Sequence, residues 1–222
     1  AGTGTGTLLV DAAGVGGGNA VTMAPGGTQD AAVQLNMGNL AAGGYTGGLT
    51  VTSTNGAGFQ TITTGTGADN ITLNPLATPS TGTATLTTGT GADSVTIGTN
   101  AAPLDFNGGA NSNAASGIDT ITGFRAGIDD IDSGTAGPLA SIYGVTSNVA
   151  TTDANLYANL NSAASGSLTG AKEAVIVSFQ DYNGGPGTFL YVDDNADGIV
   201  NQTDTIIQLI GTVGVLTQTD FI

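Results

Sequence analysis

Short groups of apolar residues recur along the first half of the chain, separated by segments rich in glycine, threonine and asparagine. Within each group, apolar side chains alternate with small polar ones, which is typical of a strand with one buried and one exposed face. The groups lie roughly 10 to 16 residues apart, and helical spacing is missing. The predicted strands are Leu8–Val10, Val21–Met23, Ala32–Leu35, Leu49–Val51, Phe59–Ile62, Ile71–Leu73, Ala84–Leu86, Val95–Ile97 and Leu104–Phe106.

One segment of this half is copied almost unchanged. Ile62–Ile71 reads ITTGTGADNI, and Leu86–Val95 reads LTTGTGADSV about 24 residues later. A looser copy, GIDTI, occupies Gly117–Ile121. The order of glycine, aspartate and a following apolar residue is close to G-G-x-G-x-D-x-U-x, which builds a parallel β-roll around calcium.

The glycines and aspartates of these copies form the first candidate metal site. Glycine permits a tight turn with inward carbonyl groups, and calcium prefers hard carboxylate oxygens. The candidate ligands are Gly65, Gly67, Asp69, Gly89, Gly91, Asp93 and Asp119. If one coil takes about 24 residues, the aspartates form a column with neighbours about 4.8 Å apart. Two carboxylates at that distance repel by roughly 1 kcal/mol even in water, and a divalent cation would reverse the sign. Ordinary turn-forming aspartates are the alternative.

A second acidic cluster follows the looser copy. Residues 119–132 read DTITGFRAGIDDID, which predicts two short strands around a turn at Arg125–Gly127. Asp129, Asp130 and Asp132 come directly after that turn. They are candidate calcium ligands, and a solvated acidic turn is the alternative interpretation.

The rest of the chain predicts one helix among strands. Thr152–Ala164 carries Leu156 and Leu160 at helical spacing, and Thr152 or Asp153 can cap its first turn. We expect this helix to pack on a sheet as a lid. The predicted strands here are Ala174–Phe179, Phe189–Val192 and Thr205–Ile210, with a turn at Asn183–Gly187 that makes a hairpin of the first two.

The segment 193–204 is a third candidate metal site. In the EF-hand type of loop, ligands come from positions 1, 3, 5, 7, 9 and 12, with glycine at 6. Counted from the first aspartate, these positions hold Asp193, Asn195, Asp197, Ile199 through its carbonyl, Asn201 and Asp204, with Gly198 at the glycine position. Asp replaces the bidentate Glu at the last position, which favours weaker or water-bridged binding. The flanks predict strands, so we expect a calcium loop within a β structure; a metal-free turn is the alternative.

Composition supports an all-β chain. Among 222 residues there are 38 glycines, abundant threonine and alanine, and few aromatic residues, which favours many short strands joined by glycine turns. We therefore expect a calcium-binding parallel β-roll or β-solenoid over residues 1–107. A C-terminal β-roll cap with one short helix would occupy residues 108–222. A β-sandwich is the alternative fold.

Charge and missing residue types narrow the function. The net charge is −15, with Arg125 and Lys172 as the only basic residues, so nucleic acid and anionic membrane surfaces are disfavoured as partners. No apolar run reaches transmembrane length, so we expect no membrane insertion. The chain has no Cys and no His, which removes disulfides and the commonest general base. Paired aspartates could serve a glycosidase, but these lie in glycine turns and loops, so we expect no enzymatic activity.

These motifs resemble the C-terminal regions of repeats-in-toxin proteins exported by type I secretion. Residues 119–132 look like the segment that closes the calcium β-roll of serralysin-like proteases, and 189–211 look like the end of that domain. The scarcity of lysine, the absence of cysteine and the Thr/Ala/Gly richness look more like a surface-layer (S-layer) protein of the Caulobacter type. The resemblance covers roughly residues 60 to 222, but only two clear and widely spaced nonapeptide cores are present.

The resemblance implies a secreted, extracellular structural protein of the bacterial cell surface. Calcium would order the chain after export, because cytosolic calcium is too low to fill weak sites. Copies would join into a lattice through calcium-bridged contacts, and another domain could bind cell-surface polysaccharide. The tail at Asp220–Ile222 would belong to an uncleaved export signal. The alternative is a noncatalytic C-terminal calcium-binding domain of a secreted protease, or an adhesin.

Overall fold

The computed structural model describes residues 8–12, 20–22, 30–35, 39–53, 60–73, 82–98, 101, 103–108, 111–134, 139–211 and 214–222. Met23 and Phe59, at the ends of two predicted strands, lie outside these ranges. The chain divides into two compact units, Ala1–Phe106 and Asn107–Ile222. Both units are built mainly from strands, as the alternating sequence pattern predicts.

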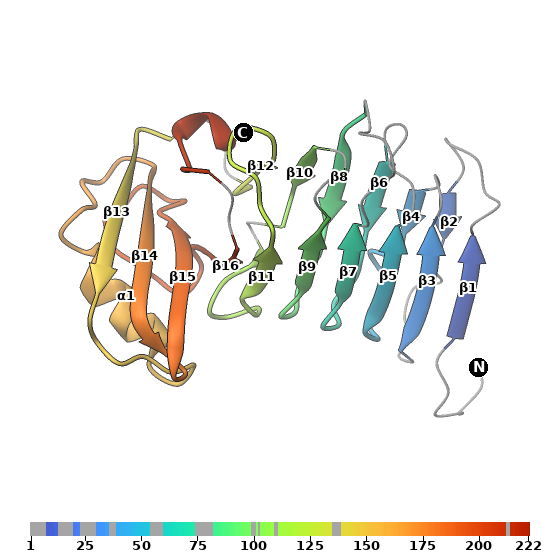
Figure 1. The fold of residues 1–222 in the computed structure, drawn as a ribbon, viewed down its shortest axis with the longest axis horizontal. Coiled ribbons are helices and arrows are strands. Elements are labelled where there is room, and N and C mark those ends of the chain that lie inside the picture. The colour runs from blue at the N-terminus through green and yellow to red at the C-terminus, as the bar shows by residue number, and fades with distance from the viewer. Residues whose placement is uncertain are drawn as a thin grey trace. The chain divides into compact units, whose positions relative to one another are not determined.

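The strands of the first unit alternate between two parallel sheets (Figure 1). They are β1 (Leu8–Ala12), β2 (Ala20–Thr22), β3 (Ala31–Leu35), β4 (Asn39–Ala41), β5 (Leu49–Ser53), β6 (Gln60–Thr63), β7 (Asn70–Leu73), β8 (Ala84–Thr87), β9 (Ser94–Ile97) and β10 (Leu104–Phe106). One sheet has the order β1-β3-β5-β7-β9, and the other has the order β2-β4-β6-β8-β10. Every strand therefore pairs with the next but one along the chain. The predicted strands are confirmed, and β4 is an additional one.

Apolar columns between the two sheets form the core of this unit. In one sheet Val51 pairs with Ile71, and Ile71 with Val95; all three are fully buried. In the other sheet Ile62 pairs with Leu86, which is also buried. Threonines between these apolar positions point outward and are exposed or half-buried. The strict period of two along each strand thus sorts side chains into core and surface.

The second unit holds a mixed sheet. Its elements are β11 (Asp119–Thr122), β12 (Asp130–Ile131), β13 (Ser141–Ser147), α1 (Leu156–Ala164), β14 (Glu173–Tyr182), β15 (Gly185–Val192), β16 (Thr205–Ile210) and the 3₁₀ turn η2 (Gln218–Asp220). The order β11-β16-β15-β14-β13 contains two parallel pairs, β11–β16 and β13–β14. The two inner pairs, β14–β15 and β15–β16, are antiparallel.

A purely parallel roll therefore does not describe the second unit, and that part of the prediction is corrected. The cause is the predicted hairpin, which places only Asn183 and Gly184 between β14 and β15. Both have positive φ, 51° and 88°, as a tight two-residue hairpin turn requires. So short a connection can join only antiparallel neighbours.

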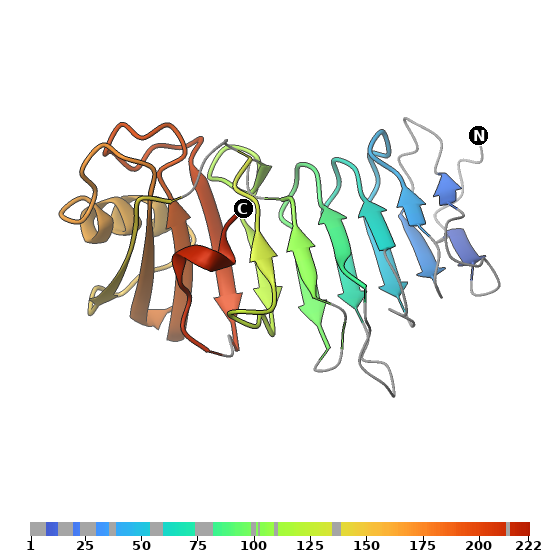
Figure 2. The ribbon, with the colours of Figure 1, turned by 90° about the horizontal axis from the view of Figure 1, so that it is seen from above.

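Helix α1 packs on one face of this sheet (Figure 2). Leu156, Leu160 and Ala164 form its buried side, and they join a cluster that includes Phe179 and Phe189. The rings of those two phenylalanines meet edge to face with centroids 6.0 Å apart. The helix is confirmed as predicted, but its start differs. It begins at Leu156, because the Asn155 side chain accepts a hydrogen bond from the Thr152 N–H (2.6 Å) and holds the preceding residues in a turn.

Among the described residues, no helix combines the length and apolar character needed to cross a membrane.

Candidate metal centres

The copied glycines lie where the backbones of successive coils touch. The Thr66 N–H donates to the Tyr45 carbonyl (2.9 Å), and the Thr90 N–H donates to the Gly65 carbonyl (3.1 Å). A side chain at Gly65 would place its Cβ 1.8 Å from the Tyr45 carbonyl oxygen, and one at Gly89 would lie 1.9 Å from that of Gly65. Gly89 also has φ +82°. Only glycine fits here, and these carbonyl groups bond along the stack to the next coil.

The predicted aspartates of the two clear copies are brought together in one column. Asp69 Oδ1 accepts the Leu49 N–H (2.7 Å), and Asp93 Oδ1 accepts the Asp69 N–H (2.8 Å). Asp69 is 2% exposed and Asp93 is 1% exposed. Each carboxylate therefore satisfies a backbone donor at the turn of the preceding coil, and does so inside the protein.

Burial makes the charged form of these carboxylates costly. It raises the pKa of Asp93 to about 7, and the nearby Asp69 carboxylate adds to that rise. Burial also raises the pKa of Asp69, although hydrogen bonds from the Leu49 and Gly65 backbone lower it in part. The Thr64 hydroxyl directs its proton to the Thr88 carbonyl (2.6 Å). Oδ2 of Asp69 is buried without a hydrogen bond of its own, which fits an oxygen that a cation could bind.

The remaining motif aspartate, Asp119, begins β11 in the second unit. Its side chain is fully buried. Its N–H donates to Ser112 Oγ (2.7 Å), and that hydroxyl in turn donates to the Ile206 carbonyl (2.6 Å). Ser112 thus links the start of β11 to β16, a role that the sequence alone did not indicate.

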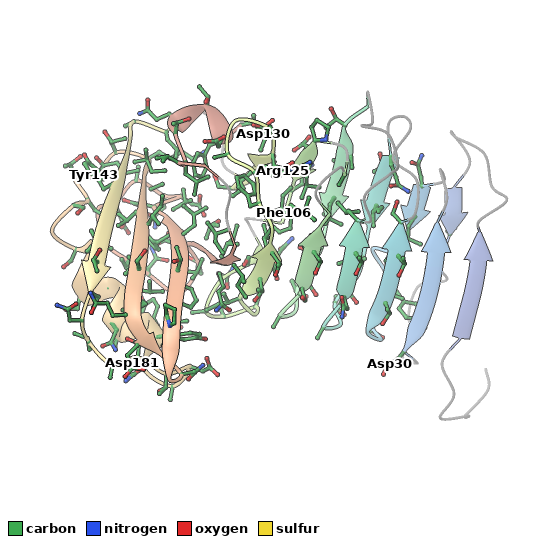
Figure 3. The ribbon with its side chains drawn as sticks, viewed as in Figure 1. Asp30, Phe106, Arg125, Asp130, Tyr143 and Asp181 are labelled. Carbon is green, nitrogen blue, oxygen red and sulfur yellow. The ribbon has the colours of Figure 1, made fainter. Side chains whose placement is uncertain are left out.

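The three aspartates of the acidic cluster after β11 have different contacts. Asp129 is fully buried and bonded to Arg125, with Arg125 Nη2 2.6 Å from Asp129 Oδ1 and Nε 2.9 Å from Oδ2. Arg125 therefore neutralises this carboxylate in the structure, and calcium binding by Asp129 stays a prediction. Figure 3 labels Arg125 and Asp130 on this turn. Asp132 is half-buried and caps a turn by accepting the Gly134 N–H (2.7 Å).

Asp130 lies close to a carboxylate that sequence reasoning placed only in an export tail. Burial raises the pKa of Asp130, and the charges of Asp220 and Asp129 raise it further. Asp220 is fully buried. It accepts hydrogen bonds from the Gly127 N–H and from the Thr217 N–H, the latter at 2.6 Å. Asp220 therefore fastens the end of the chain to the β11–β12 turn.

The loop at 193–204 folds around its first carboxylate. Asp193 is fully buried directly after β15. Its Oδ1 accepts the Asp197 N–H (3.2 Å) and its Oδ2 accepts the Gly198 N–H (2.8 Å). Gly198 has φ +77°, which allows the chain to turn back toward Asp193. Asn195 Oδ1 also accepts the Asp197 N–H (3.0 Å).

The last carboxylate closes the loop from the other side. Asp204, 1% exposed, accepts the Asn201 N–H at Oδ2 (2.8 Å) and the hydroxyl of Tyr191 at the same oxygen. Burial raises the pKa of both Asp193 and Asp204, and each pKa is raised further by a loop neighbour, Asp197 for Asp193 and Asp193 for Asp204. The carboxylate at position 1 therefore repels those at positions 5 and 12.

The predicted carbonyl ligand faces a tyrosine in this arrangement. The Tyr191 hydroxyl also lies 3.3 Å from the Ile199 carbonyl oxygen, while the Ile199 side chain is 59% exposed. The Tyr157 hydroxyl donates to the Val200 carbonyl (2.7 Å) and ties the loop to α1. Burial and the hydrogen bond to Asp204 both raise the pKa of Tyr191.

No group of three or more acidic side chains in the described parts of the chain is arranged to hold a metal ion directly. The loop would need its asparagine and carbonyl oxygens, or water, to complete a calcium shell. Two acids that the sequence did not single out, the half-buried Asp194 and the buried Glu173, have other partners. Asp194 accepts hydrogen bonds from Thr205 N–H (2.9 Å) and Oγ1 (2.6 Å). Glu173 accepts one from the Thr169 hydroxyl (2.8 Å).

No protein-family model matches the sequence, and a search of curated proteins finds no match.

Proposed function

We propose that this chain is a structural module of a secreted bacterial surface layer that binds calcium and assembles with copies of itself. The observation that supports it most is the buried column of Asp69 and Asp93. Two carboxylates lie inside the first unit, and Asp69 has an oxygen without a hydrogen bond. Residues 1–106 contain no basic side chain to neutralise them. A divalent cation would stabilise such a column in the folded state.

The finer fold belongs to the same proposal. In the first unit, strands pair with the next but one along the chain in two parallel sheets, and the copied glycines stack coil on coil. We interpret this as a β-solenoid related to the calcium β-roll. The second unit would be its C-terminal cap, which carries α1. Stacked repeats present extended surfaces, which suit a scaffold better than a catalytic cleft does.

The residues that could hold calcium fall into two groups. In the loop they are Asp193, Asn195, Asp197, Asn201 and Asp204, together with the Ile199 carbonyl. In the solenoid they are Asp69 and Asp93. Bound calcium would supply positive charge where carboxylates now repel. Outside the cell, millimolar calcium would fill weak sites that stay empty in the cytosol, so folding would follow export by type I secretion.

Terbium luminescence tests calcium binding at the loop. Terbium replaces calcium on oxygen ligands and emits when a nearby tyrosine is excited, and Tyr191 and Tyr157 both contact the loop. We expect emission from the unaltered chain that excess calcium displaces. Asp197→Asn should weaken it strongly, because Asp197 loses a charge while its backbone contacts remain. Asp181→Asn, on the exposed end of β14, is the matched control.

Absence of tyrosine-sensitised emission, or equal emission from Asp197→Asn and the unaltered chain, would contradict calcium binding at the loop. Assembly is tested separately by light scattering with and without calcium. The proposal expects particles larger than one chain in millimolar calcium and their dispersal by the chelator EGTA. A chain of unchanged size in both conditions would contradict the lattice role.

A further inference from the structure

Strand β13 is an outer strand of the sheet in the second unit. Among the residues that the structure describes, its one neighbour in that sheet is β14, and the pairing runs without interruption from Ser141↔Glu173 to Ser147↔Phe179. Figure 1 shows β13 at the border of the sheet, and Figure 3 labels Tyr143 on it. The side of β13 away from β14 therefore presents backbone N–H and C=O groups to which another strand can add.

This edge lacks the usual protection against strand addition. Natural proteins block an edge with charges, proline, a bulge or a very short strand. β13 reads SIYGVTS over 7 residues and contains neither charge nor proline, and its register has no bulge. No charged residue occurs between Asp132 and Asp153, although the whole chain has a net charge of −15. Gly144 and Thr146 are exposed.

The sequence of β13 is complementary to itself when it is read in the opposite direction. In an antiparallel pair centred on Gly144, Ser141 lies opposite Ser147, and Ile142 lies opposite Thr146. Tyr143 then lies opposite Val145. Aromatic and β-branched residues facing each other are favourable cross-strand pairs, and no like charges meet. We propose that β13 pairs antiparallel with β13 of a second copy of this chain, around a two-fold axis at Gly144.

Charge explains why the occupant is a second copy. Two chains of net charge −15 repel over most of their surfaces, so a symmetric contact forms best where both copies are uncharged. An edge-to-edge pair also makes the isologous interface that two-fold dimers use. The inference specifies one contact of the self-assembly proposed above and rests on that function, but the contact itself needs no calcium.

Disulfide capture tests the contact and its register, because the chain has no cysteine. In the proposed pair Gly144 faces Gly144, with Cα atoms about 4.5–5.5 Å apart, within reach of a disulfide. Gly144 has open space where a side chain would extend. We expect Gly144→Cys to form a covalent dimer on mild oxidation in EGTA. Thr146→Cys alone should not, whereas an equal mixture of Thr146→Cys and Ile142→Cys should crosslink.

Gly166→Cys is the matched control, since Gly166 is exposed and equally open but lies after α1. The same positions serve a charge test by sedimentation velocity in EGTA. Gly144→Lys and Gly144→Glu each place like charges opposite one another, and both should raise the dimer Kd roughly tenfold or more. Gly166→Lys should leave the Kd unchanged. Circular dichroism of each variant checks that the sheet is intact.

The outcomes separate this inference from the proposed function. If the unaltered chain forms dimers in EGTA, and both Gly144→Lys and Gly144→Glu dissociate them, the β13 contact is supported, irrespective of the particle size in calcium. Calcium-dependent particles that persist in both variants, without crosslinking of Gly144→Cys, overturn the β13 contact and leave the lattice role standing. A chain that is monomeric with and without calcium overturns both.

Discussion

The aspartates of the two copied segments show how one residue type can be a turn former and a candidate metal ligand at once. In Asp69 and in Asp93, one carboxylate oxygen accepts a hydrogen bond from a backbone N–H of the preceding coil. That bond alone would explain an aspartate at this position. It does not explain a buried ionisable group, because asparagine would accept the same bond without a charge. The buried negative charge is therefore the feature that a bound cation would stabilise.

Asp93→Asn tests whether the charge at this position is costly or useful. Without calcium, the folded Asp93 has a pKa of about 7 against 3.8 in the unfolded chain, so at pH 8 folding must keep an unfavourable charge buried. We expect the substitution to raise the free energy of unfolding in EGTA at pH 8 by about 1 kcal/mol or more. In millimolar calcium we expect the opposite sign, because the ion loses a ligand. Urea unfolding followed by circular dichroism measures both.

Asp105→Asn provides a comparison in the same unit, because Asp105 lies half-buried on the outward face of β10. Asp105→Asn should change the free energy of unfolding by no more than about 0.5 kcal/mol, both in EGTA and in millimolar calcium. An Asp93→Asn chain that is less stable than the unaltered chain in EGTA at pH 8 would show that the buried charge is not the dominant cost.

At the scale of elements, the coils of the first unit are held at a spacing that the glycines set. Gly89→Ala should destabilise by at least about 3 kcal/mol, because its φ is +82° and the new Cβ would lie 1.9 Å from the Gly65 carbonyl. Gly127→Ala separates the effect of the positive φ from the effect of the close contact between coils. Gly127 has φ +76° with open space around it, so its cost should stay near 1 kcal/mol.

Gly43→Ala completes that comparison within the first unit, since Gly43 has ordinary contacts and no positive φ. We expect its effect to lie within about 0.5 kcal/mol of zero. Urea denaturation of the three variants at one pH and one calcium concentration gives the ranking. Equal losses for Gly89→Ala and Gly127→Ala would mean that coil contact adds nothing beyond the backbone conformation.

Helix α1 stabilises the second unit through one buried side. Leu160 is fully buried against the sheet, so Leu160→Ala should lower the free energy of unfolding by about 2–5 kcal/mol. Ser162→Ala, on the exposed side of the same helix, should change it by no more than about 0.5 kcal/mol. Thermal unfolding by circular dichroism compares the pair. A small loss for Leu160→Ala would show that the helix is a loosely attached lid.

The sequence predicts these elements well where a local period decides them, and less well elsewhere. Alternation of apolar and polar residues is enough for strands such as β5 and β9. It misses β4, which has one buried apolar residue, and β13, which a glycine interrupts. The helix start is misplaced because Thr152 and Asp153 suit a cap, whereas the side chain of Asn155 decides it. The local turn predicts the antiparallel β14–β15 hairpin. The parallel pairs β11–β16 and β13–β14 join strands that no local pattern links.

The candidate sites divide in the same way. The column of Asp69 and Asp93 follows from a copied segment, and the loop at 193–204 follows from regular spacing. Both candidate sites can therefore be predicted from the sequence alone. The hydrogen bond between Asp220 and Gly127, which lie 93 residues apart, cannot be predicted in this way. The sequence predicts a calcium ligand at Asp129, and the fold adds an ion pair with Arg125 that the spacing did not indicate. Spacing identifies residues that act with their neighbours, but partners brought by the fold decide what each carboxylate does.

For the whole molecule, the described carboxylates give a definite pH dependence. Burial raises the pKa of Asp69, Asp93, Asp193, Asp194 and Asp204 in the folded chain. Between about pH 4 and pH 7 the folded chain therefore holds more protons than the unfolded chain. Stability must then fall as pH rises through this window, because the slope follows the difference in bound protons. Asp153, whose pKa is lowered, acts in the opposite sense but is exposed and titrates below this window.

We therefore expect the free energy of unfolding in EGTA to fall by roughly 1–3 kcal/mol from pH 5 to pH 8. Calcium should flatten or reverse this slope, because the ion competes with protons for the same oxygens and binds best where they are ionised. Urea unfolding at fixed ionic strength, with EGTA or calcium, measures both slopes. The double variant Asp69→Asn and Asp93→Asn should show a shallower slope in EGTA. A stability that rises with pH in EGTA would mean that these carboxylates are stabilised as anions without any metal, and the reason to invoke calcium in the column would disappear.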